Sequence, residues 1–203
     1  MTETETHIRS TLDRVVNTFT ARPGSARGTY NARVEAGEGL TATAREGDWT
    51  LDFDMPEALG GAGTAPTPGV YARTTLLACL AIGLRMEALR EGLPHARIAV
   101  AMECDCDNRG LFGIGEVPPG YEDFRLMVEV ESDAPESELR AWLNRTLGHS
   151  PWLDVFRRPQ PVSIELLVVP PAEDCPKCRR SGWMPSSWTF PTRALTPPSA
   201  HLG

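Results

Sequence analysis

The residues of this chain with the clearest chemical potential are its cysteines: Cys79, Cys104, Cys106, Cys175 and Cys178. A cysteine thiolate can serve as a nucleophile, a redox centre or a metal ligand. Cys79 lies in an apolar stretch, and its neighbours at helical spacing are Ala72, Thr75, Leu76, Ile82, Gly83 and Met86. None of these is a base or a cation, and apolar surroundings keep a thiol protonated and inert. Cys79 is therefore either a buried core cysteine or a thiol activated by another element or a partner subunit.

The other cysteines form two close pairs. Cys104 and Cys106 are two residues apart, so on a strand they share a face. Cys175-Pro-Lys-Cys178 has the spacing of a zinc or redox pair. A shared zinc site needs both pairs together, but the expected strand directions put them near opposite ends of the domain unless the tail folds back or crosses to another subunit. We therefore predict no metal and no other cofactor.

Two further candidates have ordinary explanations. His149 could act as a base, but no acid is spaced to orient it, and a surface histidine at a helix end is the commoner outcome. Ser150 lacks the glycine-flanked elbow that exposes a nucleophilic serine. Neither residue is therefore predicted to take part in catalysis.

Charge and hydropathy exclude several classes of protein. The chain has 203 residues, with Lys+Arg 20 against Asp+Glu 27 and a net charge of −7. This balance argues against nucleic-acid binding, which needs a basic surface. The longest apolar run, residues 76–84, is too short to span a bilayer, and the acidic N-terminus is no signal peptide. An odd number of cysteines in a chain that needs no disulfides favours a reduced, cytoplasmic protein.

The order of the expected elements indicates an α+β fold. Residue patterns predict a helix over 7–20, strands near 28–36, 39–46 and 49–54, a helix over 68–91, strands over 95–104 and 121–131, a helix over 135–147 and a last strand over 161–169. Thr67 and Pro68 mark the start of the long helix and Gly92 marks its end. Residues 74–86 are apolar on nearly every face, which predicts burial by a sheet on one side and a second subunit on the other. Antiparallel strands segregated from helices are typical of α+β rather than doubly wound proteins.

Three regions follow from this order. Residues 1–27 form an N-terminal helix and linker, and residues 28–169 form the main domain. Residues 170–203 form a tail rich in proline and tryptophan that carries the Cys-x-x-Cys pair. We expect the tail to pack over the domain or a neighbouring subunit.

The order and spacing of several short motifs over roughly residues 28–169 resemble the OsmC/Ohr family (osmotically inducible protein C and organic hydroperoxide resistance proteins). The motifs are Met55-Pro-Glu-Ala-Leu-Gly-Gly-Ala-Gly, Thr67-Pro68, Leu76-Leu-Ala-Cys79-Leu-Ala, Cys106-Asp-Asn-Arg-Gly110, Ser132-Asp-Ala-Pro135 and His149-Ser-Pro151. The resemblance implies an intertwined homodimer whose central buried helices are wrapped by antiparallel sheets. It is nearest to an OsmC-like branch that lacks the second cysteine.

The resemblance also implies a reaction. In peroxide-reducing members, a cysteine on the central helix attacks the peroxide, and a second cysteine then closes a disulfide with it. Cys79 matches the first cysteine, but Ser150 stands at the position of the second, and Gly69 stands where the family has a glutamate. Arg33 and Arg45 are both candidates for the family's arginine.

Two functions fit this sequence. The first is thiol-dependent reduction of an organic hydroperoxide through Cys79 at the dimer interface, with an external thiol as reductant. The second is a non-catalytic dimer that binds a small apolar ligand in the same pocket. The choice between these two functions depends on which charged group lies near Cys79 in the folded protein.

Overall fold

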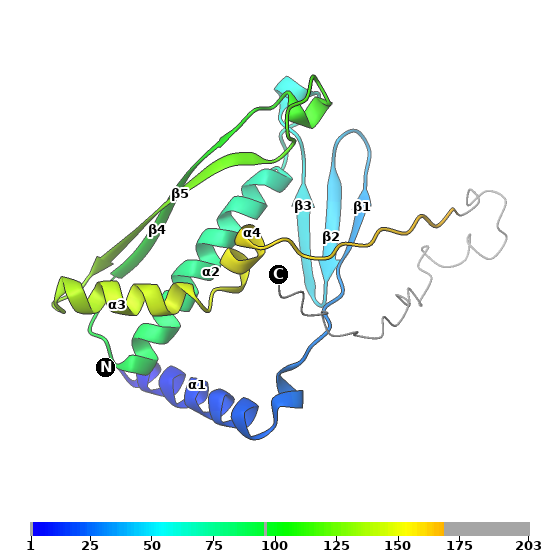
Figure 1. Ribbon diagram of the computed structural model, residues 1–203. Coiled ribbons are helices and arrows are strands. Elements are labelled where there is room, and N and C mark those ends of the chain that lie inside the picture. The colour runs from blue at the N-terminus through cyan, green and yellow to red at the C-terminus, as the bar shows by residue number, and fades with distance from the viewer. Residues whose placement is uncertain (1, 96, 169–203) are drawn as a thin grey trace, which may run out of the picture. The chain divides into compact units, whose positions relative to one another are not determined.

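The computed structural model describes residues 2–95 and 97–168 (Figure 1). The chain divides after Gln160 into two units, and the helices and strands of the described residues all lie in the first. The longer helices are α1 (Glu3–Ala21), α2 (Pro68–Glu91), α3 (Glu136–Leu147) and α4 (Pro151–Arg157). One antiparallel sheet contains β1 (Arg33–Ala36), β2 (Ala42–Glu46) and β3 (Trp49–Phe53), and a separate hairpin contains β4 (Arg97–Cys106) and β5 (Tyr121–Glu131). This mixture of helices and antiparallel sheets confirms the predicted α+β class.

Helix α2 begins and ends where its sequence signals place it. The Thr67 hydroxyl accepts a hydrogen bond from the backbone N–H of Val70 at 3.3 Å, and Pro68 occupies the first helical position. Gly92 closes the helix in the left-handed conformation, with φ at +71°, and donates its N–H to the carbonyl of Ala88. These caps satisfy backbone groups that the helix leaves unpaired at its two ends.

One stripe of α2 supplies much of the core. Leu76, Leu80, Leu84 and Ala88 recur every four residues, and each is at most 2% exposed. They pack against the β4–β5 hairpin and against α3 and α4, in two adjoining clusters. Spacing by four places side chains on one helix face, so this stripe holds that face of α2 against the hairpin, α3 and α4.

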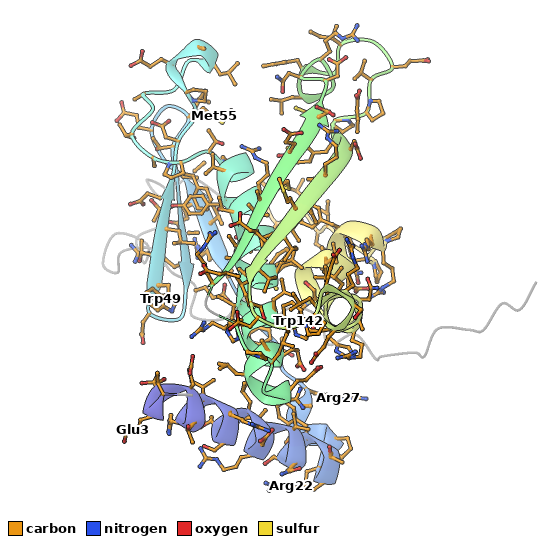
Figure 2. The ribbon with its side chains drawn as sticks, turned by 90° about the vertical axis from the view of Figure 1, so that its left-hand side faces the viewer. Glu3, Arg22, Arg27, Trp49, Met55 and Trp142 are labelled. Carbon is orange, nitrogen blue, oxygen red and sulfur yellow. The ribbon has the colours of Figure 1, made fainter. Side chains whose placement is uncertain are left out.

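The hairpin presents its apolar side chains to this stripe. Ile98, Val100 and Met102 of β4 and Leu126, Val128 and Val130 of β5 pack on the two clusters. Trp142 from α3, only 1% exposed, completes the first cluster where α3 meets α2 and the hairpin, whereas Trp49 is 75% exposed (Figure 2). Strand alternation leaves the charged residues on the other face of the hairpin, where Arg125 pairs with Asp105 at 2.6 Å and Asp123 at 2.7 Å.

The first helix is longer than the sequence pattern predicted. It begins at Glu3 because Thr2 and Glu5 form a reciprocal capping box: the backbone of Glu5 donates to the Thr2 hydroxyl, and the backbone of Thr2 donates to the Glu5 carboxylate.

Among the described residues, no helix is long and apolar enough to cross a membrane.

Two expectations about the end of the domain need correction. Residues 151–157, which we assigned to no element, form helix α4. The strand predicted over 161–169 is wrong for residues 161–168, which have no regular structure and no strand partner in the described chain. Alternating apolar residues favour a strand, but a strand exists only where another strand accepts and donates its backbone hydrogen bonds.

The loop between β3 and α2 is organised by a buried carboxylate. Asp54 is 1% exposed, and its oxygens accept hydrogen bonds from the backbone N–H and hydroxyl of Thr64, both at 2.9 Å, and from the backbone N–H of Met55 at 2.7 Å. A Cβ on Gly61 would lie 1.9 Å from the carbonyl oxygen of Met55, so this turn requires glycine. The loop therefore folds around Asp54 and brings the chain to the cap of α2.

Acidification is expected to destabilise this loop. The hydrogen bonds from Thr64 hold the pKa of Asp54 below the ordinary range of aspartate. A lowered folded-state pKa means that the contribution of Asp54 to stability is complete above its unfolded pKa of about 3.9, and is lost as the pH falls through the folded value. Asp54→Asn should lower the free energy of unfolding at pH 7 and flatten its decline below about pH 4. Urea unfolding between pH 2.5 and 7 measures this, with exposed Asp48→Asn as the control, and equal pH dependence in all three proteins would contradict it.

Candidate functional site

A cavity of about 540 Å³ lies between one face of α2 and the junction of α3 with α4. Its walls are mostly apolar, with a few polar groups among them. The lining residues are Thr75, Ala78, Cys79, Leu80, Ile82, Gly83, Leu84, Met86 and Glu87 from α2, and Thr146, Leu147, His149, Ser150, Pro151 and Trp152 from α3, the junction and α4. This volume is in the range of pockets that hold small organic molecules.

Cys79 is half-buried on the α2 wall of this cavity, with a free thiol. Thr75, Ile82 and Met86, its neighbours at helical spacing, line the same cavity. As the sequence predicts, none of these neighbours of Cys79 is a base or a cation. What the sequence could not show is that His149 lies on the wall of the same cavity. The structure thus brings together two candidate residues that are 70 positions apart in the chain.

Ser150 has a structural role on this wall. Its hydroxyl accepts a hydrogen bond from the backbone N–H of Leu153 at 3.4 Å, and Pro151 fills the first helical position of α4. Leu153, 5% exposed, then packs on Leu76 and Leu80. Serine before proline is a strong helix-start signal, so α4 could have been predicted from these residues.

Two other polar side chains of the cavity wall, those of Glu87 and Thr146, are already hydrogen-bonded. Glu87 accepts two hydrogen bonds from the Nη1 of Arg90, at 2.7 and 3.0 Å. The hydroxyl of Thr146 donates to the carbonyl of Trp142 at 2.9 Å. The thiol of Cys79 and the imidazole of His149 are the side chains left for proton-transfer or covalent chemistry.

A smaller cavity of about 330 Å³ lies at the other end of α2, beside α1. Its polar groups belong to Glu5 and His95, and both are engaged: Arg85 lies 3.4 Å from the Glu5 carboxylate and 3.3 Å from Nε2 of His95. Because this cavity holds no nucleophile, we assign the candidate site to the larger one.

The other predicted cysteines lie elsewhere. Cys104 is half-buried and Cys106 is exposed, both on β4, with an irregularity in strand pairing between Asp105 and Cys106. Within residues 2–95 and 97–168, no three histidine, cysteine or acidic side chains are grouped to hold a metal ion. Cys175 and Cys178 lie outside the described residues, so a shared zinc site stays untested.

The two candidate arginines are not on the cavity wall. Arg33 and Arg45 face each other across β1 and β2. Arg33 is paired with Glu35, and Arg45 donates to the hydroxyl of Thr50 at 3.2 Å. Neither is among the residues that line the cavity with Cys79.

A family profile described as OsmC-like protein matches residues 61–165, which is about half of the chain. The chain belongs to the OsmC-like family. Solved structures with a similar fold include an OsmC-like protein from Mycoplasma pneumoniae, at 14% identity and a TM-score of 0.55, covering 64% of this chain and 88% of that one. An organic hydroperoxide resistance protein OsmC from Legionella pneumophila has 19% identity and a TM-score of 0.48, covering 65% and 91% of the two chains. OhrB of Bacillus subtilis, an organic hydroperoxide resistance protein, has 17% identity and a TM-score of 0.43, covering 64% and 91%. No curated protein matches the sequence.

At the start of α2, this OsmC-like protein carries a positive charge beside Gly69, the position at which the family resemblance implies a glutamate. A Cβ on Gly69 would lie 2.9 Å from Nη1 of Arg73, and this nitrogen donates to the hydroxyl of Tyr121 at 2.7 Å. Glycine at this position thus gives the Arg73 guanidinium room to cross the first turn of α2. The place of Arg73 could not be predicted from the sequence, because its position beside Gly69 depends on Tyr121 of β5.

Introducing a thiol at the Ser150 position tests whether the cavity keeps the family's arrangement. In the wild type, limited oxidation by an organic hydroperoxide should leave Cys79 as a sulfenic acid, whereas Ser150→Cys should allow a disulfide to Cys79. A disulfide needs Cα atoms within about 7 Å, a demanding test of geometry. The lost cap should also lower the free energy of unfolding by about 1 kcal/mol.

Peptide mass spectrometry after oxidation measures this bridge. Ser137→Cys, on the exposed face of α3, is the control that should not bridge. A wild-type disulfide that includes Cys79, or no bridge in Ser150→Cys, would contradict the expected arrangement.

Proposed function

We propose that this protein reduces organic hydroperoxides through the single thiol of Cys79. The observation that carries the proposal is a half-buried free thiol on the wall of a mostly apolar cavity of about 540 Å³, in a chain of the OsmC-like family. An apolar cavity favours the alkyl part of an organic hydroperoxide over water and hydrogen peroxide, because burial of apolar surface is favourable.

The reaction needs one nucleophile and an external reductant. The sulfur of Cys79 attacks the terminal oxygen of R–O–O–H, the S–O bond forms as the O–O bond breaks, and the products are an alcohol and a cysteine sulfenic acid. An external thiol condenses with the sulfenic acid to release water, and a second thiol reduces the mixed disulfide. This regenerates Cys79 without a resolving cysteine.

Replacement of the cysteine tests the proposal. Cys79→Ser should abolish consumption of an alkyl hydroperoxide in the presence of dithiothreitol, down to the rate without protein, because serine cannot form a sulfenic acid. Cys106→Ser removes an exposed thiol that does not line the cavity and should keep the wild-type rate. Wild-type protein that consumes no hydroperoxide, and whose Cys79 is alkylated no faster than a free thiol at any pH, would overturn the proposal.

The second candidate function is binding of a small apolar ligand without catalysis. Gly69 and Ser150 favour it, since both stand where peroxide-reducing relatives carry functional groups. A fluorescent apolar probe distinguishes the two: binding in the cavity without peroxide turnover supports the second function, and turnover supports the first.

We also propose that the protein is a homodimer, with the uncovered face of α2 at the interface. The stripe from Leu76 to Ala88 is buried within the chain, but Ile82 and Met86, on another face of the same helix, are 61% and 39% exposed. Exposed apolar side chains on a helix whose opposite face is in the core are typical of an interface. This matches the burial on all sides that the sequence predicts.

A charge on this face should break the dimer. Ile82→Glu should shift the sedimenting species at micromolar concentration from dimer to monomer, or unfold the protein if the monomer is unstable alone. Met127→Glu places the same charge on an exposed residue of β5 and should leave the dimer intact. A wild-type protein that sediments as a folded monomer would contradict this assembly.

A further inference from the structure

The wall of the cavity holds few groups that can move a proton near neutral pH. Cys79, Glu87 and His149 are the titratable residues in its lining. Glu87 is held by Arg90 through both of its oxygens. Imidazole is the side chain whose charge changes most readily between about pH 5 and 8, so His149 is the proton carrier best suited to a reaction at Cys79.

The backbone that carries His149 is fixed on both sides. Its N–H donates to the carbonyl of Thr146 at 3.0 Å, and the next residue, Ser150, caps α4. Helix α4 is in turn anchored on α2 through Leu153. His149 therefore extends from a short connector between two packed helices, and its exposed ring is free to meet a molecule in the cavity.

Most of the charges on the surrounding helices are paired with one another, although Arg157 of α4 is in no ion pair of the described residues. On α3, Arg145 lies 2.6 Å from Glu91 of α2, and on α4, Asp154 lies 2.6 Å from Arg158. Arg90 and Glu87 form the remaining pair on this side of α2. Among the described residues no carboxylate forms an ion pair with His149, so no neighbouring acid holds its ring.

We infer that His149 carries the proton between the thiol of Cys79 and the leaving oxygen of the hydroperoxide. This inference rests on the proposed function and adds a residue to it. The neutral ring takes the proton of the Cys79 thiol, which leaves a thiolate and an imidazolium. The thiolate attacks the terminal oxygen, the S–O bond forms, the O–O bond breaks, and the imidazolium gives its proton to the departing alkoxide. The products are Cys79 sulfenic acid, an alcohol and neutral His149, so protons and electrons balance.

The substrate's leaving group provides a readout specific to this role. An alkoxide is a poor leaving group and needs the proton, whereas the acetate that leaves peroxyacetic acid does not. In single-turnover oxidation at pH 7, His149→Gln should slow sulfenic acid formation by at least about tenfold with tert-butyl hydroperoxide, and by clearly less with peroxyacetic acid. Added imidazole should restore part of the lost rate, and His7→Gln on α1 is the matched control.

A second measurement separates failure of this inference from failure of the proposed function. The rate of Cys79 alkylation by iodoacetamide, followed from pH 5 to 9, needs no peroxide. His149→Gln should change its pH dependence, and His7→Gln should not. If the wild type is oxidised by tert-butyl hydroperoxide but His149→Gln matches it with both peroxides, the inference is overturned and the proposed function stands.

If neither peroxide oxidises the wild type, the proposed function fails and alkylation decides whether His149 acts on the thiol. An unchanged alkylation profile overturns that coupling, and a changed profile supports it. Circular dichroism and an independent His149→Asn variant ensure that a loss of rate is not a loss of folding.

Discussion

Helix α2 has apolar side chains around most of its circumference, and the need to remove them from water determines how the rest of this protein is arranged. The stripe that begins at Leu76 lies against the β4–β5 hairpin, α3 and α4, and Trp142 closes the cluster at one end. At about 25 cal/mol per Å² of apolar surface buried, these contacts are the main source of the stability of the described core. The face with Ile82 and Met86 is not covered by the chain itself, which is the physical basis for the proposed dimer.

The same constraint defines the chemistry available to Cys79. A cysteine on such a helix has apolar neighbours by necessity, so a functional partner has to come from another element. The proposed partner, His149, comes from the junction of α3 and α4, which lines the cavity, and Leu153 packs α4 on α2. Packing of whole helices thus puts a titratable group and a thiol on the wall of one cavity.

The two positions at which the chain departs from its peroxide-reducing relatives have local structural roles. Ser150 caps α4, which a cysteine would do poorly, and Gly69 makes room for the contact of Arg73 with Tyr121. Both residues fit their local structure, and the family resemblance implies a catalytic group at each of these positions. A catalytic Cys79 therefore has to depend on residues other than Gly69 and Ser150. Besides Cys79, the titratable residues that line the cavity are Glu87 and His149.

Local signals in the sequence determined most of the secondary structure and the family. Thr67, Pro68 and Gly92 act through hydrogen bonds and backbone angles within a few residues of themselves, so the bounds of α2 could be predicted from them. The motifs around Cys79 identified the OsmC-like fold for the same reason, since they lie along the chain in order. Tertiary structure alone decided the rest. The strand expected over 161–169 needs a partner strand that the described chain does not supply, and periodicity cannot reveal that. Cys79 and His149 line one cavity and Arg73 contacts Tyr121, although both pairs are far apart in sequence. Packing of whole elements, rather than the preference of any one residue, decides this.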